Sequence, residues 1–276
     1  MNKSYQKYSG AGNKFIIFDN LSDDIADRSE MVVSLFKNGA NDEVDGVIFL
    51  EKGDPGDFSM NYFNRDGTAD SLCGNGLRCT TRFISDNALS PKKLLHIASI
   101  GNIYLSGILD DGRITVSFPP PMIIRAEMKL KVNFSGWWED LPCSYVDVGS
   151  PHIVIFIDDI GKGLKSMDEV NVEEWGRNIR MHNDLLPAGA NVNFVQVTDP
   201  ADSSLIIHTY ERGVERETLA CGTGALSSGI VAFIKKGLQP PINMFTRSGE
   251  ILSVGFKVDG NEFRELTLTG GAERYE

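Results

Sequence analysis

Leu72-Cys73-Gly74-Asn75-Gly76-Leu77-Arg78-Cys79 has a close copy in the second half of the chain, Ala220-Cys221-Gly222-Thr223-Gly224-Ala225. In each copy a cysteine precedes Gly-x-Gly and then a run typical of a helix, residues 77–84 in the first copy and 225–234 in the second. The second run has so little polar surface that we expect a buried helix. The duplication therefore predicts two similar halves, each with a cysteine at the start of an apolar helix.

A cysteine in this position lies beside the unpaired backbone N–H groups and the positive end of the helix dipole. Such surroundings favour the thiolate and lower the pKa of a cysteine below its ordinary value of about 8.5. The glycines leave the N–H groups open to a bound carboxylate or phosphate. Two such assemblies in one chain predict that the sulfurs of Cys73 and Cys221 serve one site.

Composition narrows the class of ligand. The net charge of −11, with no cluster of Lys and Arg, argues against a nucleic-acid surface or a polybasic membrane patch, so we expect a small-molecule ligand. No segment approaches the roughly 20 apolar residues of a membrane span, and the N-terminus has no signal-peptide pattern. We therefore expect a cytoplasmic protein with no nucleic-acid or membrane partner.

The chain has four cysteines: Cys73, Cys79, Cys143 and Cys221. They are too few for a disulfide framework at 276 residues, and in a reducing compartment we expect thiols. Cys73 and Cys79 have no Cys or His partner at zinc-site spacing, so we expect no metal.

Alternating polarity and turn residues predict more strands than helices in each half. Expected strands in the first half are 5–8, 14–19, 47–50, 58–62, 93–98, 102–109 and 113–118, with a helix over 30–37 capped by Ser29. Those in the second half are 145–148, 152–157, 191–197, 205–210, 242–246, 251–258 and 263–269, with a helix after Asn171 to residue 180.

Pro119-Pro120-Pro121 stops any strand or helix near mid-chain and predicts domains of residues 1–119 and 120–265. The expected fold class is α/β (α+β), with two pseudosymmetric domains. Each domain is a sheet wrapped around a central apolar helix, and the site lies in the cleft between them.

The motifs resemble those of the diaminopimelate epimerase family. The first cysteine motif follows Asn64-Arg65-Asp66-Gly67, and the second follows Glu211-Arg212-Gly213 and Glu217-Thr218-Leu219-Ala220. Further matches are Gly10-Ala11-Gly12-Asn13, Pro151-His152, Asn191 and Thr269-Gly270. The resemblance spans nearly the whole chain, although Ser150 stands where the family usually has Asn before Pro-His.

This resemblance implies a pyridoxal-phosphate-independent isomerase, without cofactor or metal. Its expected substrate is a small amino acid, LL-diaminopimelate, which it converts to the meso form for lysine and peptidoglycan synthesis. The implied catalytic residues are Cys73, Cys221, His152 and Glu211. The implied substrate-binding residues are Asn13, Asn64, Gly74, Asn75, Asn191, Arg212, Gly222 and Thr223. The resemblance also implies that the last strand, about residues 266–276, packs with the first domain.

Inverting an α-carbon requires an acid and a base on opposite faces, which the two cysteines supply as thiol and thiolate. By the resemblance, His152 and Glu211 contact the substrate ammonium or help to set the cysteine ionisation. Helix N–H groups suit the negative charge that develops on the carboxylate, and the fork of Arg212 suits a substrate carboxylate.

Three alternatives stay open. One is a related two-cysteine racemase or epimerase with another substrate, such as proline or hydroxyproline. A second is a dithiol redox protein using Cys73 and Cys221, against which the lack of Cys-x-x-Cys counts. A third is a non-catalytic anion-binding module. The sequence does not fix the oligomeric state and leaves a homodimer open.

Overall fold

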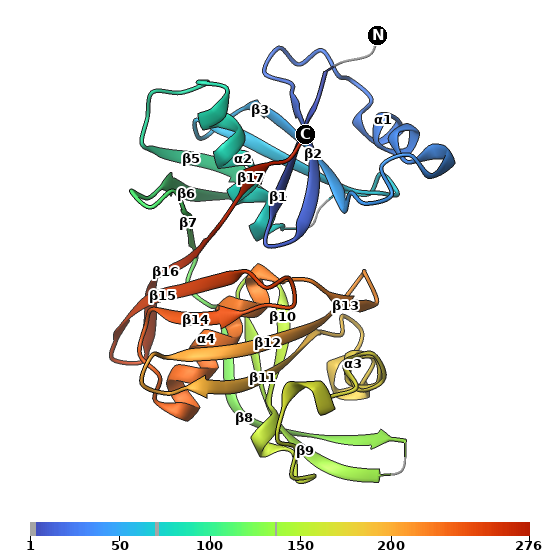
Figure 1. Ribbon diagram of the computed structural model, residues 1–276, viewed down its shortest axis with the longest axis vertical. Coiled ribbons are helices and arrows are strands. Elements are labelled where there is room, and N and C mark those ends of the chain that lie inside the picture. The colour runs from blue at the N-terminus through green and yellow to red at the C-terminus, as the bar shows by residue number, and fades with distance from the viewer. Residues whose placement is uncertain (1–3, 70–71, 136) are drawn as a thin grey trace. The chain divides into compact units, whose positions relative to one another are not determined.

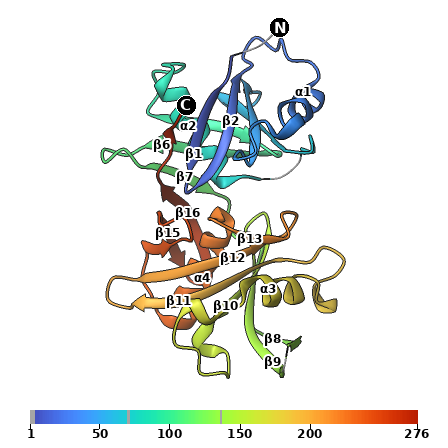
Figure 2. The ribbon, with the colours of Figure 1, turned by 45° about the vertical axis from the view of Figure 1, so that its right-hand side comes forward.

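The computed structural model describes residues 4–69, 72–135 and 137–276 (Figures 1 and 2). The chain divides into two compact units, Met1–Ser117 with Thr269–Glu276, and Phe118–Leu268. We propose that these units are the two domains that the duplicated motif predicts. Among the described residues, none of the helices combines the length and the apolar character needed to cross a membrane.

The first unit is a sheet with one long helix against it. Its strands are β1 (Gln6–Gly10), β2 (Asn13–Asp19), β3 (Gly46–Lys52), β4 (Phe58–Asn64), β5 (Leu94–Ser99), β6 (Asn102–Ile108), β7 (Ile114–Phe118) and β17 (Glu273–Arg274). Its helices are α1 (Arg28–Leu35), η1 (Lys37–Gly39) and α2 (Gly74–Asp86). β17 pairs with β1 and so ties the C-terminus to this unit.

The second unit repeats this plan at greater length. Its strands are β8 (Ile123–Phe134), β9 (Trp137–Asp147), β10 (Pro151–Phe156), β11 (Asn191–Asp199), β12 (Ser204–Glu211), β13 (Arg216–Thr218), β14 (Ile242–Phe245), β15 (Ile251–Asp259) and β16 (Glu262–Gly270). Its helices are η2 (Ile157–Asp159), η3 (Met167–Glu169), α3 (Val172–Arg180), η4 (Asn183–Leu185) and α4 (Gly222–Lys236).

Strand pairing shows that the two units share one topology. An antiparallel hairpin (β1–β2, then β9–β10) leads to a parallel neighbour (β3, then β11). An antiparallel strand follows (β4, then β12), and after it comes the cysteine helix. The chain then adds a parallel strand (β5, then β14) that starts another hairpin. The structural duplication therefore extends well beyond the two short motifs.

Both motif helices are packed against the strands of their own unit (Figures 1 and 2). α2 contacts β1, β2 and β6, whereas α4 contacts β10, β11 and β15. Every residue of α4 from Gly222 to Ala232 is buried, as its apolar sequence predicts. The expected fold class, a sheet around an apolar helix in each half, is confirmed at the level of each unit.

Several elements of the second unit were missed, and the longest of them are strands. The long β8–β9 hairpin lies where only residues 145–148 were expected as a strand. One face of β8 is buried through Leu130, Val132 and Phe134, and the Phe134 ring stacks on Trp175 of α3 at 5.3 Å between ring centroids. The alternation is clear over these residues, but exposed apolar residues near the start of β8 obscure it. β13 was also missed, because three residues carry too short a pattern.

One cap was assigned to the wrong residue. α1 begins after Asp27, whose side chain accepts a hydrogen bond from the Glu30 backbone N–H at 3.0 Å. Ser29 lies within the helix, and its hydroxyl donates instead to Gly67 O at 3.0 Å. Both residue types cap helices well, so the tertiary contact decides between them. The predicted cap of α3 by Asn171 is confirmed.

Candidate active site

Each unit has a cysteine as the N-cap of its buried helix. Cys73 precedes α2 and Cys221 precedes α4, and both cap residues have extended backbone angles. The helices begin directly at the first glycine of each Gly-x-Gly, so the motif forms the first turn itself. Its backbone N–H groups lack intrahelical acceptors, as in any first turn.

The sulfur of Cys73 takes the place of a capping oxygen. It is half-buried, and Cys73 Sγ accepts the backbone N–H of Gly76 at 3.3 Å. A hydrogen bond donated to sulfur is stronger when the sulfur is charged, so this contact favours the thiolate over the thiol.

A tight turn brings Asn13 to the start of α2. Ala11 and Gly12 join β1 to β2 with φ of 52° and 83°, the left-handed pair of a two-residue hairpin. The Asn75 side chain donates to Asn13 Oδ1, and Asn13 Nδ2 donates to Asp45 Oδ2 at 3.3 Å. Two of the predicted binding residues are thus linked directly to each other beside Cys73.

Arg78 supports this pair and was not predicted. It is fully buried, and its Nη2 donates to Asn75 Oδ1 at 2.8 Å while its Nε donates to Gly271 O at 3.2 Å. A charged side chain in a helix expected to be buried was the available signal. Arg78 therefore fixes the Asn75 amide and fastens the C-terminal segment to α2.

Asn64 ends β4 and closes the turn that follows it. Its Nδ2 donates to Thr68 Oγ1 at 3.0 Å, and its Oδ1 accepts from the Tyr62 hydroxyl at 3.2 Å. The Asn64 side chain is half-buried and is held by hydrogen bonds within this turn. Residues 70 and 71, between this turn and Cys73, lie outside the described residues.

The second cysteine has a different environment. Cys221 Sγ lies 3.5 Å from Thr223 Oγ1, and Thr223 Oγ1 lies 2.9 Å from His152 Nε2. His152 is completely buried at the start of β10, and burial lowers its pKa from 6.5 to about 3, with the positive charge of Arg212 acting in the same direction. His152 is consequently a neutral imidazole at physiological pH, linked to the sulfur through one hydroxyl.

Asn191 and Arg212 are joined through the backbone. Asn191 Oδ1 accepts the Arg212 N–H at 2.8 Å, while Asn191 Nδ2 donates to Ser150 Oγ at 2.9 Å and to Pro151 O at 3.0 Å. Asn191 thereby ties the residues before β10 to the end of β12. The Arg212 guanidinium donates to Ala188 O at 3.2 Å and remains half-buried.

Glu211 is the last residue of β12. Its Oε2 accepts the Thr218 hydroxyl at 2.9 Å, and the side chain is half-buried. Of the residues expected in the second half, hydrogen bonds connect His152 with Thr223, Thr223 with Cys221, and Asn191 with Arg212, and Asn191 Nδ2 lies 3.4 Å from His152 Nε2.

The remaining cysteines are buried. Cys79 is 0% exposed, and burial raises the pKa of the Cys143 thiol to about 12. Over residues 4–69, 72–135 and 137–276, no group of three or more His, Cys, Asp or Glu side chains is arranged to hold a metal ion.

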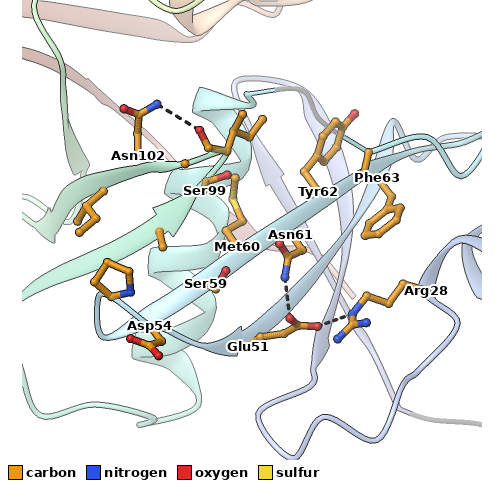
Figure 3. A pocket seen from close by; sticks show the side chains of 16 residues that line it. Arg28, Glu51, Asp54, Ser59, Met60, Asn61, Tyr62, Phe63, Ser99 and Asn102 are labelled. Carbon is orange, nitrogen blue, oxygen red and sulfur yellow. Dashed lines mark hydrogen bonds and ion pairs between the residues drawn. The ribbon is translucent and has the colours of Figure 1, made fainter.

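A pocket on the first unit is separate from these residues. Figure 3 shows its lining, where Glu51 accepts hydrogen bonds from Arg28 and from Asn61, the latter at 2.7 Å. None of the predicted site residues appears in this lining. The Glu51 carboxylate at this pocket is already held by protein donors.

Comparison with known proteins identifies a family that the sequence matches. The sequence matches the family described as diaminopimelate epimerase over residues 5–123 and 144–274, leaving out most of the β8–β9 hairpin. A diaminopimelate epimerase of Hydrogenobaculum sp. is 36% identical over 265 residues, covering 92% of this chain and 91% of that protein. One from Aquifex aeolicus is 34% identical over 286 aligned positions, covering 96% and 93%.

Solved structures share the fold at much lower identity. A probable proline racemase from Agrobacterium radiobacter, with bound carbonate, superposes with a TM-score of 0.72 at 14% identity, covering 98% of this chain and 90% of that one. A hydroxyproline epimerase from Agrobacterium vitis, with bound trans-4-hydroxy-L-proline, gives 0.70 at 16%, covering 99% and 90%. At these identities the likeness shows a common fold.

Proposed function

Because this chain belongs to the diaminopimelate epimerase family, we propose that it interconverts LL- and meso-diaminopimelate with Cys73 and Cys221 as its two acid/base groups. The observation that carries the proposal is the pair of N-capping cysteines, each on the buried helix of one repeat. A duplicated fold with one cysteine per copy suits a reaction that needs one proton-transfer group on each face of a carbon. The product would serve lysine and peptidoglycan synthesis.

The reaction is a pair of proton transfers. The thiolate of one cysteine takes the α-proton, so the C–H bond breaks, an S–H bond forms, and the electron pair remains on the substrate. The thiol of the other cysteine then gives its proton to the opposite face of the carbon. The number of protons on the enzyme is unchanged, and the two cysteines exchange roles.

The charge left on the substrate must be stabilised by fixed dipoles. Backbone N–H groups at Gly74, Asn75, Gly222 and Thr223 belong to first helical turns and suit a substrate carboxylate whose charge increases as the proton leaves. These groups cost little reorganisation, because both helices are packed in place before any ligand binds.

The other predicted residues receive distinct roles in this proposal. Asn13 and Asn75 form one hydrogen-bonded pair beside Cys73, and Asn64 stands at the end of β4 to reach substrate. Arg212 binds a carboxylate at the far end of the substrate, and Glu211 attracts the ammonium group. Asn191 acts through Arg212, because its amide already holds that residue's backbone.

His152 acts on Cys221 rather than on the ammonium. Because His152 is completely buried, we expect it to make no contact with the substrate ammonium. Because its imidazole is neutral, it forms no ion pair with a thiolate. Its imidazole instead reaches the sulfur through the Thr223 hydroxyl.

Isotope incorporation tests the two-thiol mechanism. In heavy water at early conversion, the product from LL-diaminopimelate should carry deuterium at the inverted carbon, while recovered substrate should keep its hydrogen. Cys73→Ala or Cys221→Ala should abolish inversion, and the Ser variants should be nearly as damaged, since a hydroxyl is a far weaker acid than a thiol. Cys143→Ala is the matched control and should remain active.

Two results would contradict the proposal. Product without deuterium in the first turnovers would mean that one base serves both faces. Turnover of L-proline in preference to diaminopimelate would assign the chain to the other substrate class, which the shared fold alone does not favour.

A further inference from the structure

Asn193 stands outside every residue assigned so far, yet it is completely buried against His152. It lies on β11 two positions after Asn191, and its side chain makes three hydrogen bonds. Asn193 Nδ2 lies 3.1 Å from Ile153 O and 3.0 Å from His152 Nδ1, and Asn193 Oδ1 accepts the Thr209 hydroxyl at 2.9 Å.

These contacts fix the direction of the amide. A backbone carbonyl oxygen only accepts, so the NH₂ group of Asn193 must face Ile153 O. The same NH₂ group then faces His152 Nδ1, which must accept. A neutral imidazole that accepts at Nδ1 carries its proton at Nε2.

The proton at Nε2 determines the next bond in turn. His152 Nε2 donates to Thr223 Oγ1 at 2.9 Å, so the single hydroxyl proton of Thr223 is directed away from the imidazole. Cys221 Sγ lies 3.5 Å from that hydroxyl, within reach of it. Asn191 Nδ2 also lies 3.4 Å from His152 Nε2, but its two protons go to the nearer Ser150 Oγ and Pro151 O.

We propose that Asn193 is a positioning residue, which fixes the direction of a hydrogen-bond chain through His152 and Thr223 so that the Thr223 hydroxyl donates to the Cys221 sulfur. This inference rests on the proposed function only in treating Cys221 as an acid/base group. With this direction the chain supplies a donor to the thiolate. In the reverse direction Thr223 would donate to His152 and present lone pairs to the sulfur, which favours the thiol.

The second glycine of the motif has a separate role in this arrangement. A Cβ at Gly224 would collide with Asn193 Oδ1. The glycine therefore makes room for Asn193 against the first turn of α4, in addition to leaving the helix N-terminus open.

The tautomer of His152 can be measured in the unmodified protein. Nitrogen-15 NMR of labelled protein at neutral pH should show His152 neutral, protonated at Nε2 and bare at Nδ1. The His152 resonances are identified by their loss in His152→Gln. Protonation at Nδ1, or a charged ring at neutral pH, would overturn the proposed direction without any variant of Asn193.

Variants then test the link to the sulfur through the pH dependence of Cys221 alkylation, followed by peptide mapping. Asn193→Leu and Thr223→Val should each raise the thiol pKa of Cys221 by about one pH unit or more, because the thiolate loses a hydrogen-bond donor. Thr223→Ser keeps a hydroxyl and should restore the original pKa. Thr81→Val removes a buried hydroxyl in the first unit and is the matched control, which should leave the thiol pKa of Cys221 unchanged.

The outcome separates this inference from the proposed function. If folded Asn193→Leu and Thr223→Val both leave the Cys221 pKa unchanged, the hydrogen-bond chain does not act on the sulfur. If the pKa moves as expected but the native enzyme does not epimerise diaminopimelate, the chain stands and the proposed function fails. If both hold, Asn193→Leu should lower kcat more than it raises KM, since Asn193 is buried behind His152.

Discussion

Replacing Gly224 with alanine should damage the second unit, whereas the equivalent Gly76→Ala should be tolerated in the first. The two glycines hold the same place in the duplicated motif, but their surroundings differ. A Cβ at Gly224 would collide with the Asn193 amide oxygen, a buried atom in a fixed hydrogen bond. A Cβ at Gly76 would meet the flexible end of Ile48 at 3.2 Å and Cys73 Sγ at 3.3 Å.

The magnitudes follow from these contacts. Alanine gains up to about 1 kcal/mol over glycine in a helix, and both variants share this gain. Forcing a group into a packed core costs roughly 1–3 kcal/mol. Displacing Asn193 also weakens its hydrogen bonds, at about 1 kcal/mol each. We therefore expect Gly224→Ala to lower the free energy of unfolding by roughly 1–5 kcal/mol, whereas at Gly76 the close contacts offset the helix gain and leave the free energy of unfolding nearly unchanged.

Urea and thermal unfolding measure this difference. Each kcal/mol should lower Tm by roughly 2–4 °C for a unit of this size. Gly224→Ala should also raise the thiol pKa of Cys221, because the moved amide no longer fixes the His152 tautomer. Equal stability of the two alanine variants, with Cys221 alkylation unchanged, would refute the assignment of Gly224 as the space for Asn193.

Three further changes have defined outcomes. Arg78→Met removes buried bonds to Asn75 and the C-terminal segment, so it should lower the free energy of unfolding by about 2–4 kcal/mol and alter Cys73 alkylation. Arg82→Met is its control, because it loses a bond to the same segment but none to Asn75, and it should leave Cys73 alkylation unchanged. Arg212→Lys should raise KM for diaminopimelate in steady-state assays, because a point charge cannot replace the two-donor fork. Between pH 6.5 and about 3, His152 binds a proton in the unfolded chain but stays neutral in the folded one, because burial lowers its pKa. The free energy of unfolding is therefore full above pH 6.5 and falls by about 1.4 kcal/mol for each pH unit below it within this range. In urea titrations His152→Gln should flatten this part of the pH profile.

The sequence predicted the parts of the fold that local patterns determine. Both cysteine helices were expected because Gly-x-Gly and the apolar run that follows are contiguous, and α3 because Asn171 is a strong cap. The β8–β9 hairpin was missed because exposed apolar residues near the start of β8 obscure the alternation, and the α3 helix that covers its buried face lies far along the chain.

The candidate site was predictable only in part, for the same reason. The two cysteines can be recognised by their repeated sequence context. The role of Asn193 depends instead on contacts with other elements, directly with Ile153 and through His152 with Thr223. A signal for Asn193 did exist, since residues two apart on a strand face the same side and Asn191 was already suspected. What no sequence pattern gives is the direction of a hydrogen bond.

The two cysteines are held by donors of different kinds, and this difference bears on a reversible reaction. Cys73 receives a backbone N–H, which always donates, whereas in the direction proposed above Cys221 receives the Thr223 hydroxyl, whose orientation depends on His152. In the proposed mechanism the two thiols share one negative charge, so weakening the hydroxyl donor in Asn193→Leu should shift that charge from Cys221 toward Cys73. The ratio of kcat/KM for the two isomers cannot report this shift, because the equilibrium between the isomers fixes it. The free enzyme can, so in this variant alkylation at neutral pH should move from Cys221 to Cys73, and an unchanged partition between the two thiols would show that they do not share one charge.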